Sequence, residues 1–380
     1  MTFEQTGNQF LEWLKENKAT ISDSIAFKDY RQENAGRGVV ALKPIKEGDI
    51  LFSIPRNLLF SIKTSILSTK EDMASVLATL TGWSPLILCM MYEMKNDDSF
   101  WKPYFDILPR TFSTPMFWPD VESLKGTGVI GKIGKEEADQ IYDNQFIPII
   151  KAHPTLFDAK IHTKELFHTC GSIIMAYSFH DEYKTEEEEE QEDENSDDEE
   201  EEEEGVLTMV PMADMLNHKT GYNNARLFHE PEELVMKAIK PIQPNDQIYN
   251  TYGDLCNADL LRKYGFTDEN NPYDLCEIDG QNVMNLACPK DNDETLKEEK
   301  LNFLMEEGVM DDCFVIDTEY EIPEEMIISV IVFNSSSDIF KKMAAKSKLP
   351  SPKINDQVQQ ILINILENRL ASYPTNLKVK

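Results

Sequence analysis

The chain opens with a helical pattern of apolar and polar positions. Phe10, Trp13 and Leu14 recur at the spacing of one helix face, which is typical of an amphipathic helix. Thr2 and Gln5 fit a capping box, in which two side chains satisfy free backbone donors at a helix start. The pattern therefore predicts a first helix over residues 3–17.

The next segment changes to short β-rich runs that are separated by glycine and proline. Residues 36–42 and 50–55 are the two runs, and Pro44 and Gly48 lie between them. Runs bounded in this way are typical of short antiparallel strands. Similar runs return at residues 207–212, 234–239 and 247–249. Both stretches are therefore predicted to contribute to one β-rich core.

Helical signals dominate residues 62–180, between the two β-rich stretches. Ser84-Pro85 is a typical helix start, and Thr163 can cap a helix that carries apolar residues at helical spacing as far as Tyr177. The end of the chain is also helical, most clearly in the periodic run 354–370. Patterning therefore predicts an α+β chain with a β-rich core, a helical insertion and a helical C-terminal domain.

Length and composition narrow the class of protein. A chain of 380 residues, 41% of them hydrophobic, can bury a full core and form two or more structural units. It lacks a charge-free apolar run long enough to cross a bilayer and a secretory signal at its start. We therefore expect a soluble intracellular protein with no membrane partner. The six cysteines are scattered without a C-x-x-C pair, which favours reduced thiols over disulfides or a zinc cluster.

The negative charge is concentrated in one tract. Residues 186–204 hold 16 acidic side chains and no base, so half of the net charge of −32 lies there and half on the rest of the chain. Like charges at that density oppose folding, and residues 184–205 are predicted to form a disordered acidic loop. The alternative is that this acidic tract attracts basic substrates electrostatically. The acidity argues against direct nucleic-acid binding and for a basic protein partner.

Four short motifs carry candidate chemistry. They are Gly36-Arg37-Gly38, Val210 to His218, Asn250-Thr251-Tyr252-Gly253 and Tyr264-Gly265-Phe266. Taken alone, each has an ordinary structural interpretation as a glycine turn, a pair of turn residues or a partly buried tyrosine. The glycine pair lacks the third glycine of a dinucleotide fingerprint, and the sequence has no phosphate-binding loop pattern.

Taken together, the motifs resemble the SET-domain protein methyltransferases. The resemblance is closest to the Rubisco-methyltransferase-like group, in the branch with SET domain-containing protein six and ribosomal lysine methyltransferase four. The matching segments follow the family's order over about two-thirds of the chain: Gly36–Gly38, Trp101–Phe105, Pro115–Pro119, Ala176–Phe179, Val210–His218, Asn250–Gly253 and Tyr264–Phe266. The C-terminal hundred residues match only in helical character and position.

The resemblance implies a fold and a domain plan. The implied fold is α+β, with a β-rich SET core whose pseudoknot threads the segment 250–252 under the loop near Asn217. The SET domain would span residues 1–272, with a helical insertion at about 62–180 and the acidic loop at 184–205. Residues 273–380 would form an all-α substrate-binding domain of the Rubisco-methyltransferase type.

The resemblance also implies methyl transfer from S-adenosyl-L-methionine to a lysine side chain, with no metal. Tyr252 would be the catalytic tyrosine, because its hydroxyl could orient the amine and stabilise charge on the transferring methyl group. The implied cofactor residues are Gly36, Arg37, Gly38, Tyr177, Asn217, His218 and Tyr264. The implied substrate-channel residues are Trp101, Ser178 and His180.

Two other functions stay open. A non-catalytic binder or chaperone of basic proteins could use the acidic tract and the helical C-terminal domain. A histidine N-methyltransferase is the other, since some relatives in the wider group methylate histidine.

For the lysine enzyme, the expected substrate is a ribosomal protein, a histone or a transcription factor, and a monomer is expected. The resemblance places the protein in the nucleus, with the cytoplasm as a second location.

Overall fold

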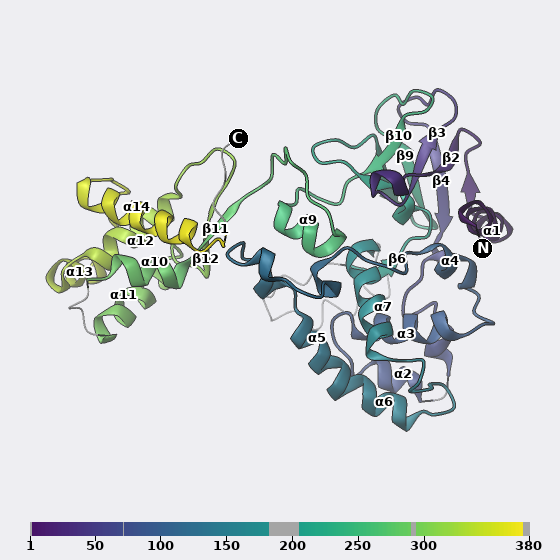
Figure 1. Cartoon of the computed structure of the whole chain (residues 1–380), viewed down its shortest axis with the longest axis horizontal. Coiled ribbons are helices and arrows are strands. Elements are labelled where there is room, and N and C mark those ends of the chain that lie inside the picture. Colours follow the sequence, from purple (N-terminus) through teal and green to yellow (C-terminus); the bar gives the residue numbers. More distant parts are fainter. Residues whose placement is uncertain (1, 71, 182–204, 290–293, 375–380) are drawn as a thin grey trace. The chain divides into compact units, whose positions relative to one another are not determined.

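The structure is a computed structural model that describes residues 2–70, 72–181, 205–289 and 294–374 (Figure 1). Contacts divide the chain into two compact units. Met1–Ser113 and Gly134–Asp254 form the first, and Thr114–Ile133 and Leu255–Lys380 form the second. The division by contacts therefore falls before the predicted domain boundary at residue 272. Apart from Gly205, the predicted acidic loop lies outside the described residues.

The first helix forms where the pattern predicts it. Helix α1 spans Phe3–Glu16, and its capping box is complete: the Thr2 hydroxyl accepts from the Gln5 N–H, and the Gln5 side chain accepts from the Thr2 N–H. Phe10 and Leu14 on the apolar face are fully buried. Phe10 stacks on Tyr104 of α4 (Lys102–Ile107), with ring centroids 6.0 Å apart. The amphipathic pattern thus anchors α1 to the helical insertion.

Two four-stranded sheets form the β core of the first unit. One has the order β1 (Thr20–Ile21), β4 (Ile50–Pro55), β9 (Glu233–Ala238), β8 (Ala225–His229). The other has the order β2 (Ile25–Asp29), β3 (Arg37–Ala41), β10 (Gln247–Asn250), β7 (Asn217–His218). The predicted runs 36–42 and 50–55 are therefore strands, but they enter different sheets. Strands β1, β2, β7 and β8 were not predicted, because they are short or carry exposed polar positions.

Strand β10 joins parts of the chain that are distant in sequence. It pairs antiparallel with β3, with Ile248 opposite Val39, and parallel with β7, with Asn250 opposite His218. Ile248 and Val39 are fully buried. The glycine-bearing strand β3, the strand β10 that leads to Tyr252 and the Asn-His strand β7 therefore follow one another in one sheet. Figure 1 shows β3 and β10 together in this sheet.

The predicted helical insertion is present between β4 and β5 (Ser178–Asp181). Besides α4, its helices in the first unit are α2 (Met73–Leu77), α3 (Ser84–Lys95), α5 (Lys135–Ile141), α6 (Ile147–Ala152) and α7 (Lys164–Tyr177). The Thr163 hydroxyl caps α7 by accepting from the Leu166 N–H. Helix α7 packs along α3 and runs directly into β5, which pairs with β6 (Val206–Met209). This path connects the insertion to the segment that leads to Asn217.

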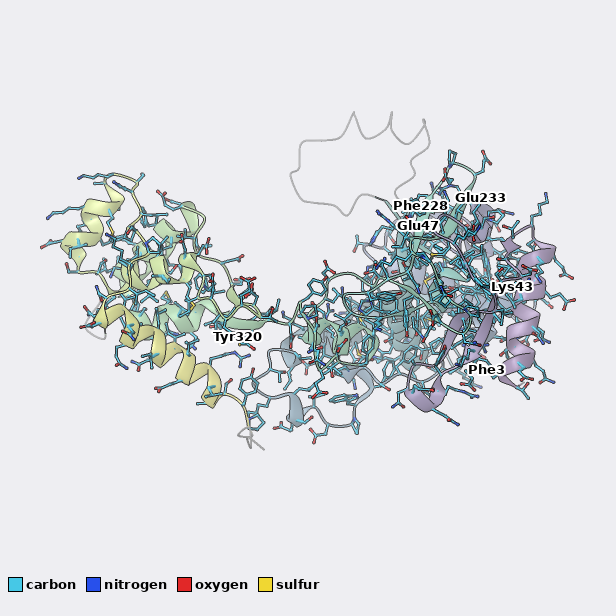
Figure 2. The ribbon with its side chains drawn as sticks, turned by 90° about the horizontal axis from the view of Figure 1, so that it is seen from above. Phe3, Lys43, Glu47, Phe228, Glu233 and Tyr320 are labelled. Carbon is cyan, nitrogen blue, oxygen red and sulfur yellow. The ribbon has the colours of Figure 1, made fainter. Side chains whose placement is uncertain are left out.

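The second unit is mainly helical and has a core of its own. Its helices are α9 (Asn257–Tyr264), α10 (Gly280–Ala287), α11 (Glu294–Glu306), α12 (Glu324–Asn334), α13 (Ser337–Ala344) and α14 (Asp356–Ala371). Leu304, Phe333 and Ile365 are fully buried in this core. An antiparallel pair, β11 (Cys276–Asp279) and β12 (Cys313–Ile316), adds a small sheet that helical patterning did not predict. Tyr320, labelled in Figure 2, is 84% exposed in the loop after β12.

Lys300 of α11 stabilises the second unit from inside. Its side chain is fully buried, and its Nζ donates to the carbonyls of Phe333 at 2.8 Å and Ser335 at 2.7 Å, at the end of α12. Lys300→Met keeps much of the volume but leaves both carbonyls unpaired. Because an unpaired buried polar group costs about 1–3 kcal/mol, we expect the free energy of unfolding to fall by about 3 kcal/mol.

Urea denaturation of full-length protein measures this effect. The matched control is Lys297→Met on the same helix, because Lys297 forms an ion pair with the exposed carboxylate of Glu294. The control should change stability by less than about 1 kcal/mol, as is usual for surface pairs. Equal losses in the two variants would contradict the role of Lys300.

Candidate active site

Gly38 of β3 lies against side chains of two neighbouring strands and of Tyr30. A Cβ added to Gly38 would lie 2.6 Å from Gln247 Nε2, 2.8 Å from Tyr30 Cδ2 and 2.9 Å from Asn217 Nδ2. These separations are shorter than normal contacts, so only glycine permits this approach. The structure thus brings Gly38 and Asn217 together, two of the residues predicted to bind the cofactor.

Two unpaired amide donors converge on Gly38. Asn217 Nδ2 and Gln247 Nε2 are buried and have no hydrogen-bond partner among the described residues. Buried donors are nearly always paired, and a ligand is one explanation of an exception. A ligand with carboxylate or carbonyl oxygens would satisfy both. Gln247 was not predicted as a site residue, because a single glutamine at the start of a strand belongs to no motif.

His218 and Tyr252 form a stacked pair. Their ring centroids are 5.0 Å apart and their planes differ by 19°. His218 Nδ1 accepts from the backbone N–H of Tyr252 at 3.1 Å. Because a backbone N–H can only donate, neutral His218 carries its proton on Nε2. The Tyr252 hydroxyl donates to the carbonyl of Leu216 at 3.2 Å. Both ends of Tyr252 are thereby anchored to the segment 216–218.

Gly36 and Arg37 contribute in different ways. Gly36 has φ +60°, and a Cβ there would meet nothing within 4 Å, so this glycine serves the backbone turn. The Arg37 side chain runs to α1, where Nη2 donates to the Phe3 carbonyl at 3.1 Å and to the Thr6 hydroxyl at 3.2 Å. Burial lowers the pKa of Arg37 to about 10. Phe3 is labelled in Figure 2. Because the Arg37 side chain contacts α1, the predicted cofactor role of Arg37 falls to its backbone groups.

Three predicted residues lie where α7 meets β5. Tyr177 is the last residue of α7 and is half-buried. Ser178 pairs with Met209, and His180 pairs with Leu207, in the small sheet of β5 and β6. Met209 directly precedes the segment Val210 to His218. The fold therefore places this trio beside the start of that segment, and their roles with cofactor and substrate stay predictions.

The contacts of Trp101 are those of a core residue. Its side chain is 2% exposed, and its ring centroid lies 5.3 Å from that of Phe60 and 5.8 Å from that of Trp13. Aromatic pairs at such distances stabilise a folded core. The role of Trp101 in a substrate channel stays a prediction.

Tyr264 belongs to the second unit. It ends α9, and the next residue, Gly265, has φ +82° in the left-handed conformation that terminates a helix. Burial raises the pKa of Tyr264 to about 12, so its hydroxyl stays protonated at neutral pH. Its role in the cofactor pocket stays a prediction.

Asp214 is a buried carboxyl within the Val210 to His218 segment. Its Oδ2 accepts from the Tyr104 hydroxyl at 2.5 Å, and its Oδ1 has no partner among the described residues. Burial raises the pKa of Asp214 to about 7. Burial also raises the pKa of Tyr104 well above its ordinary value. This pair ties α4 to the turn that leads to Asn217 of β7. Sequence patterning missed the pair because Asp214 and Tyr104 lie 110 residues apart in the chain.

The raised pKa of Asp214 predicts a pH-dependent stability. Between its ordinary pKa of 3.8 and about 7, the unfolded chain releases this proton while the folded chain keeps it. Stability from this group is therefore full at low pH and is lost as the pH rises through that window, by about 1.4 kcal/mol per unit. Relative to Asp214→Asn, the wild type should lose roughly 3 kcal/mol between pH 4.5 and pH 8.

Urea denaturation at several pH values measures the difference between wild type and Asp214→Asn. Asp254→Asn provides the control, because Asp254 is exposed. The control and the wild type should show the same pH dependence. Parallel curves for the wild type and Asp214→Asn would exclude the proposed ionisation.

With this geometry established, comparison with known proteins defines the class. A family model of the SET domain matches residues 36–253, more than half of the chain. The chain belongs to the SET-domain family, as its motifs predict. It is 34% identical over 350 residues to zebrafish (Danio rerio) N-lysine methyltransferase setd6, covering 88% of this chain and 74% of that protein.

Two further likenesses agree with this assignment. Ribosomal lysine N-methyltransferase 4 of Saccharomyces cerevisiae is 35% identical over 295 residues, which cover 74% of this chain and 60% of that protein. A solved structure described as Rubisco LSMT bound to AdoMet matches with a TM-score of 0.70 at 19% identity, covering 98% of this chain and 82% of that one. The predicted SET fold with a helical insertion and helical C-terminal part is thereby confirmed.

Proposed function

We propose that this chain is a protein-lysine N-methyltransferase that uses S-adenosyl-L-methionine. The observation that carries the proposal is the convergence of Gly38, Asn217 and Tyr252, from three distant segments, at one sheet of a SET domain. The names of the zebrafish and yeast relatives, both lysine methyltransferases, support the reaction class. A structure described as the SET domain of LSMT with lysine and AdoHcy has the same fold, with a TM-score of 0.69.

The residues around Gly38 fit the polar groups of this cofactor. Asn217 and Gln247 provide the unpaired amide donors, which suit the carboxylate of the methionine part. Gly38 allows the cofactor to approach the backbone closely. His218 carries its proton on Nε2, which lies 3.4 Å from the Thr220 hydroxyl, and this N–H suits an acceptor nitrogen of adenine that replaces this long contact. When bound, S-adenosyl-L-methionine supplies an electrophilic methyl group.

Tyr252 is the proposed catalytic residue. A free lysine amine is protonated near neutral pH, with a pKa of about 10.4, and a buried apolar channel disfavours the charged form. The Tyr252 hydroxyl donates a hydrogen bond to the carbonyl oxygen of Leu216. The hydroxyl oxygen therefore keeps lone pairs that can accept a hydrogen bond from the amine. Stacking on His218 fixes the ring. Tyr252 therefore orients the amine, and alignment of this kind supplies much of an enzyme's rate gain.

The proposed substrate is a basic protein, such as a ribosomal protein, a histone or a transcription factor. The net charge of −32 supports this choice, because an acidic surface attracts basic partners and repels nucleic acid. The proposed form is a monomer that works in the nucleus and also in the cytoplasm.

Incubation with radiolabelled S-adenosyl-L-methionine and a cell extract tests the reaction. We expect a labelled basic protein in which mass spectrometry finds methyl-lysine. Excess S-adenosylhomocysteine should reduce the labelling, because it competes with the cofactor for its site. Methyl-histidine in that protein would instead establish the histidine enzyme. A cofactor-binding protein that labels no extract would contradict the lysine enzyme, and failure to bind the cofactor would favour the acidic binder of basic proteins.

A further inference from the structure

A cavity of about 250 Å³ lies in the first unit, outside the candidate active site. It is formed by the end of α3 and by the loop between α6 and α7. The residues that define its chemistry are Tyr92, Lys95, Leu156, Phe157, Ile161 and His162. The loop leads into the start of α7, whose other end carries Tyr177. At 1.5 Å per residue, the length of α7 separates the two ends by roughly 20 Å.

His162 is the buried polar side chain of this cavity. It is 3% exposed, and its Nε2 has no partner among the described residues. Its Nδ1 lies 3.1 Å from the backbone nitrogen of Asp158 and 3.1 Å from the carbonyl oxygen of the same residue. The carbonyl of Asp158 already accepts from the N–H groups of Ile161 and His162. The Asp158 N–H therefore donates to Nδ1, and the neutral ring carries its proton on Nε2 as an unpaired donor.

The charges around the cavity favour a ligand with a single negative charge. Lys95 is exposed and contributes an ammonium group. Burial lowers the pKa of His162 and is the largest influence on it; the backbone and charge of Asp158 raise this pKa, the charge of Lys95 lowers it, and the net shift is downward, toward a neutral ring. Asp158 also lines the cavity, where its Oδ1 accepts from the Lys160 N–H. Its negative charge would repel a doubly charged phosphate more strongly than a carboxylate.

The walls of the cavity are apolar. The Phe157 ring is 3% exposed and packs edge-on against the Tyr92 and His162 rings, with centroid distances of 5.8 and 5.1 Å. Ile161 is 44% exposed, so part of the apolar wall faces outward. Sites for drug-sized ligands are typically about 300–1,000 Å³. This cavity is smaller, which limits the ligand to a compact molecule.

We propose that this cavity binds a small organic monocarboxylate, with its carboxylate on Lys95 and His162 and its apolar body on Phe157 and Ile161. This binding site is independent of the proposed methyl transfer. A ligand of this size should bind with a dissociation constant on the order of 1–10 mM.

Benzoate is a suitable probe, and the full-length protein labelled at isoleucine methyl groups is the sample. Titration followed by NMR should shift the Ile161 signal and saturate, whereas the cationic analogue benzylamine should leave it unchanged. Lys95→Gln should weaken benzoate at least about fivefold, because it removes the charge that faces the carboxylate. The control is Lys151→Gln, an exposed lysine on α6 that does not line the cavity.

His162→Leu, which removes the ring donor, supplies a second test that does not depend on Lys95, with folding checked by circular dichroism. It should also weaken benzoate. The proposal is overturned if benzoate leaves Ile161 unchanged, if benzylamine binds equally well, or if Lys95→Gln and Lys151→Gln bind benzoate alike. Methyltransferase assays of the same variants should show unchanged turnover, which separates this site from the proposed active site.

Discussion

Tyr252→Phe is expected to reduce methyl transfer by at least about 100-fold. The substitution removes the hydroxyl, which is the group placed to orient the amine. Removal of one preorganised polar group commonly lowers turnover by about 10²–10³-fold. The phenylalanine ring can still stack on His218, and the backbone N–H of residue 252 can still donate to Nδ1. Cofactor affinity and folding should therefore change little.

Single-turnover transfer of a labelled methyl group measures the effect of Tyr252→Phe, with calorimetry for cofactor affinity and circular dichroism for folding. Tyr222→Phe is the matched control, because Tyr222 is 38% exposed and lies outside the His218 stack. The control should keep wild-type turnover. Full activity in a folded Tyr252→Phe protein would refute the catalytic assignment.

Gly38→Ala is expected to weaken S-adenosyl-L-methionine binding at least about tenfold. Its Cβ would lie 2.6 Å from Gln247 Nε2 and 2.9 Å from Asn217 Nδ2, so both amides must move. Loss of two positioned hydrogen bonds costs about 1–3 kcal/mol, and 1.4 kcal/mol corresponds to a factor of ten in affinity. The added Cβ would also lie 2.8 Å from Cδ2 of the Tyr30 ring, so circular dichroism is needed to confirm that the variant stays folded.

Calorimetric titration of the cofactor into Gly38→Ala measures this loss. Gly131→Ala is the control, since a Cβ there meets nothing within 4 Å. The control should bind the cofactor as the wild type does. Equal affinity in Gly38→Ala and the wild type would show that the cofactor does not lie against β3.

The sequence predicted the elements that carry a strong local pattern. The capping box of α1, the start of α3 at Ser84 and the cap of α7 at Thr163 were all predicted correctly. These features depend on side chains within a few residues of each other, so a local sequence pattern is enough to predict them. The pairing of β3 with β10 depends on contacts between distant segments, and no local pattern specifies them.

The candidate site shows the same division. Gly38, Asn217 and Tyr252 were predicted from motifs that resemble a family. Gln247 and Tyr30 approach Gly38 only through the folded sheet. The contact between Asp214 and Tyr104 likewise joins a loop to a helix of the insertion. Sequence could identify the motif residues, but partners from other elements became visible only in three dimensions.

Hydrogen–deuterium exchange with and without S-adenosyl-L-methionine tests the central claim most directly. The account predicts that the cofactor protects backbone amides in β3, in the segment 216–218 and in the segment 247–252, because these lie together around Gly38. Gly38→Ala should abolish this protection at the same cofactor concentration. Saturating cofactor that protects none of these three segments, or protects only residues elsewhere in the chain, would contradict the account.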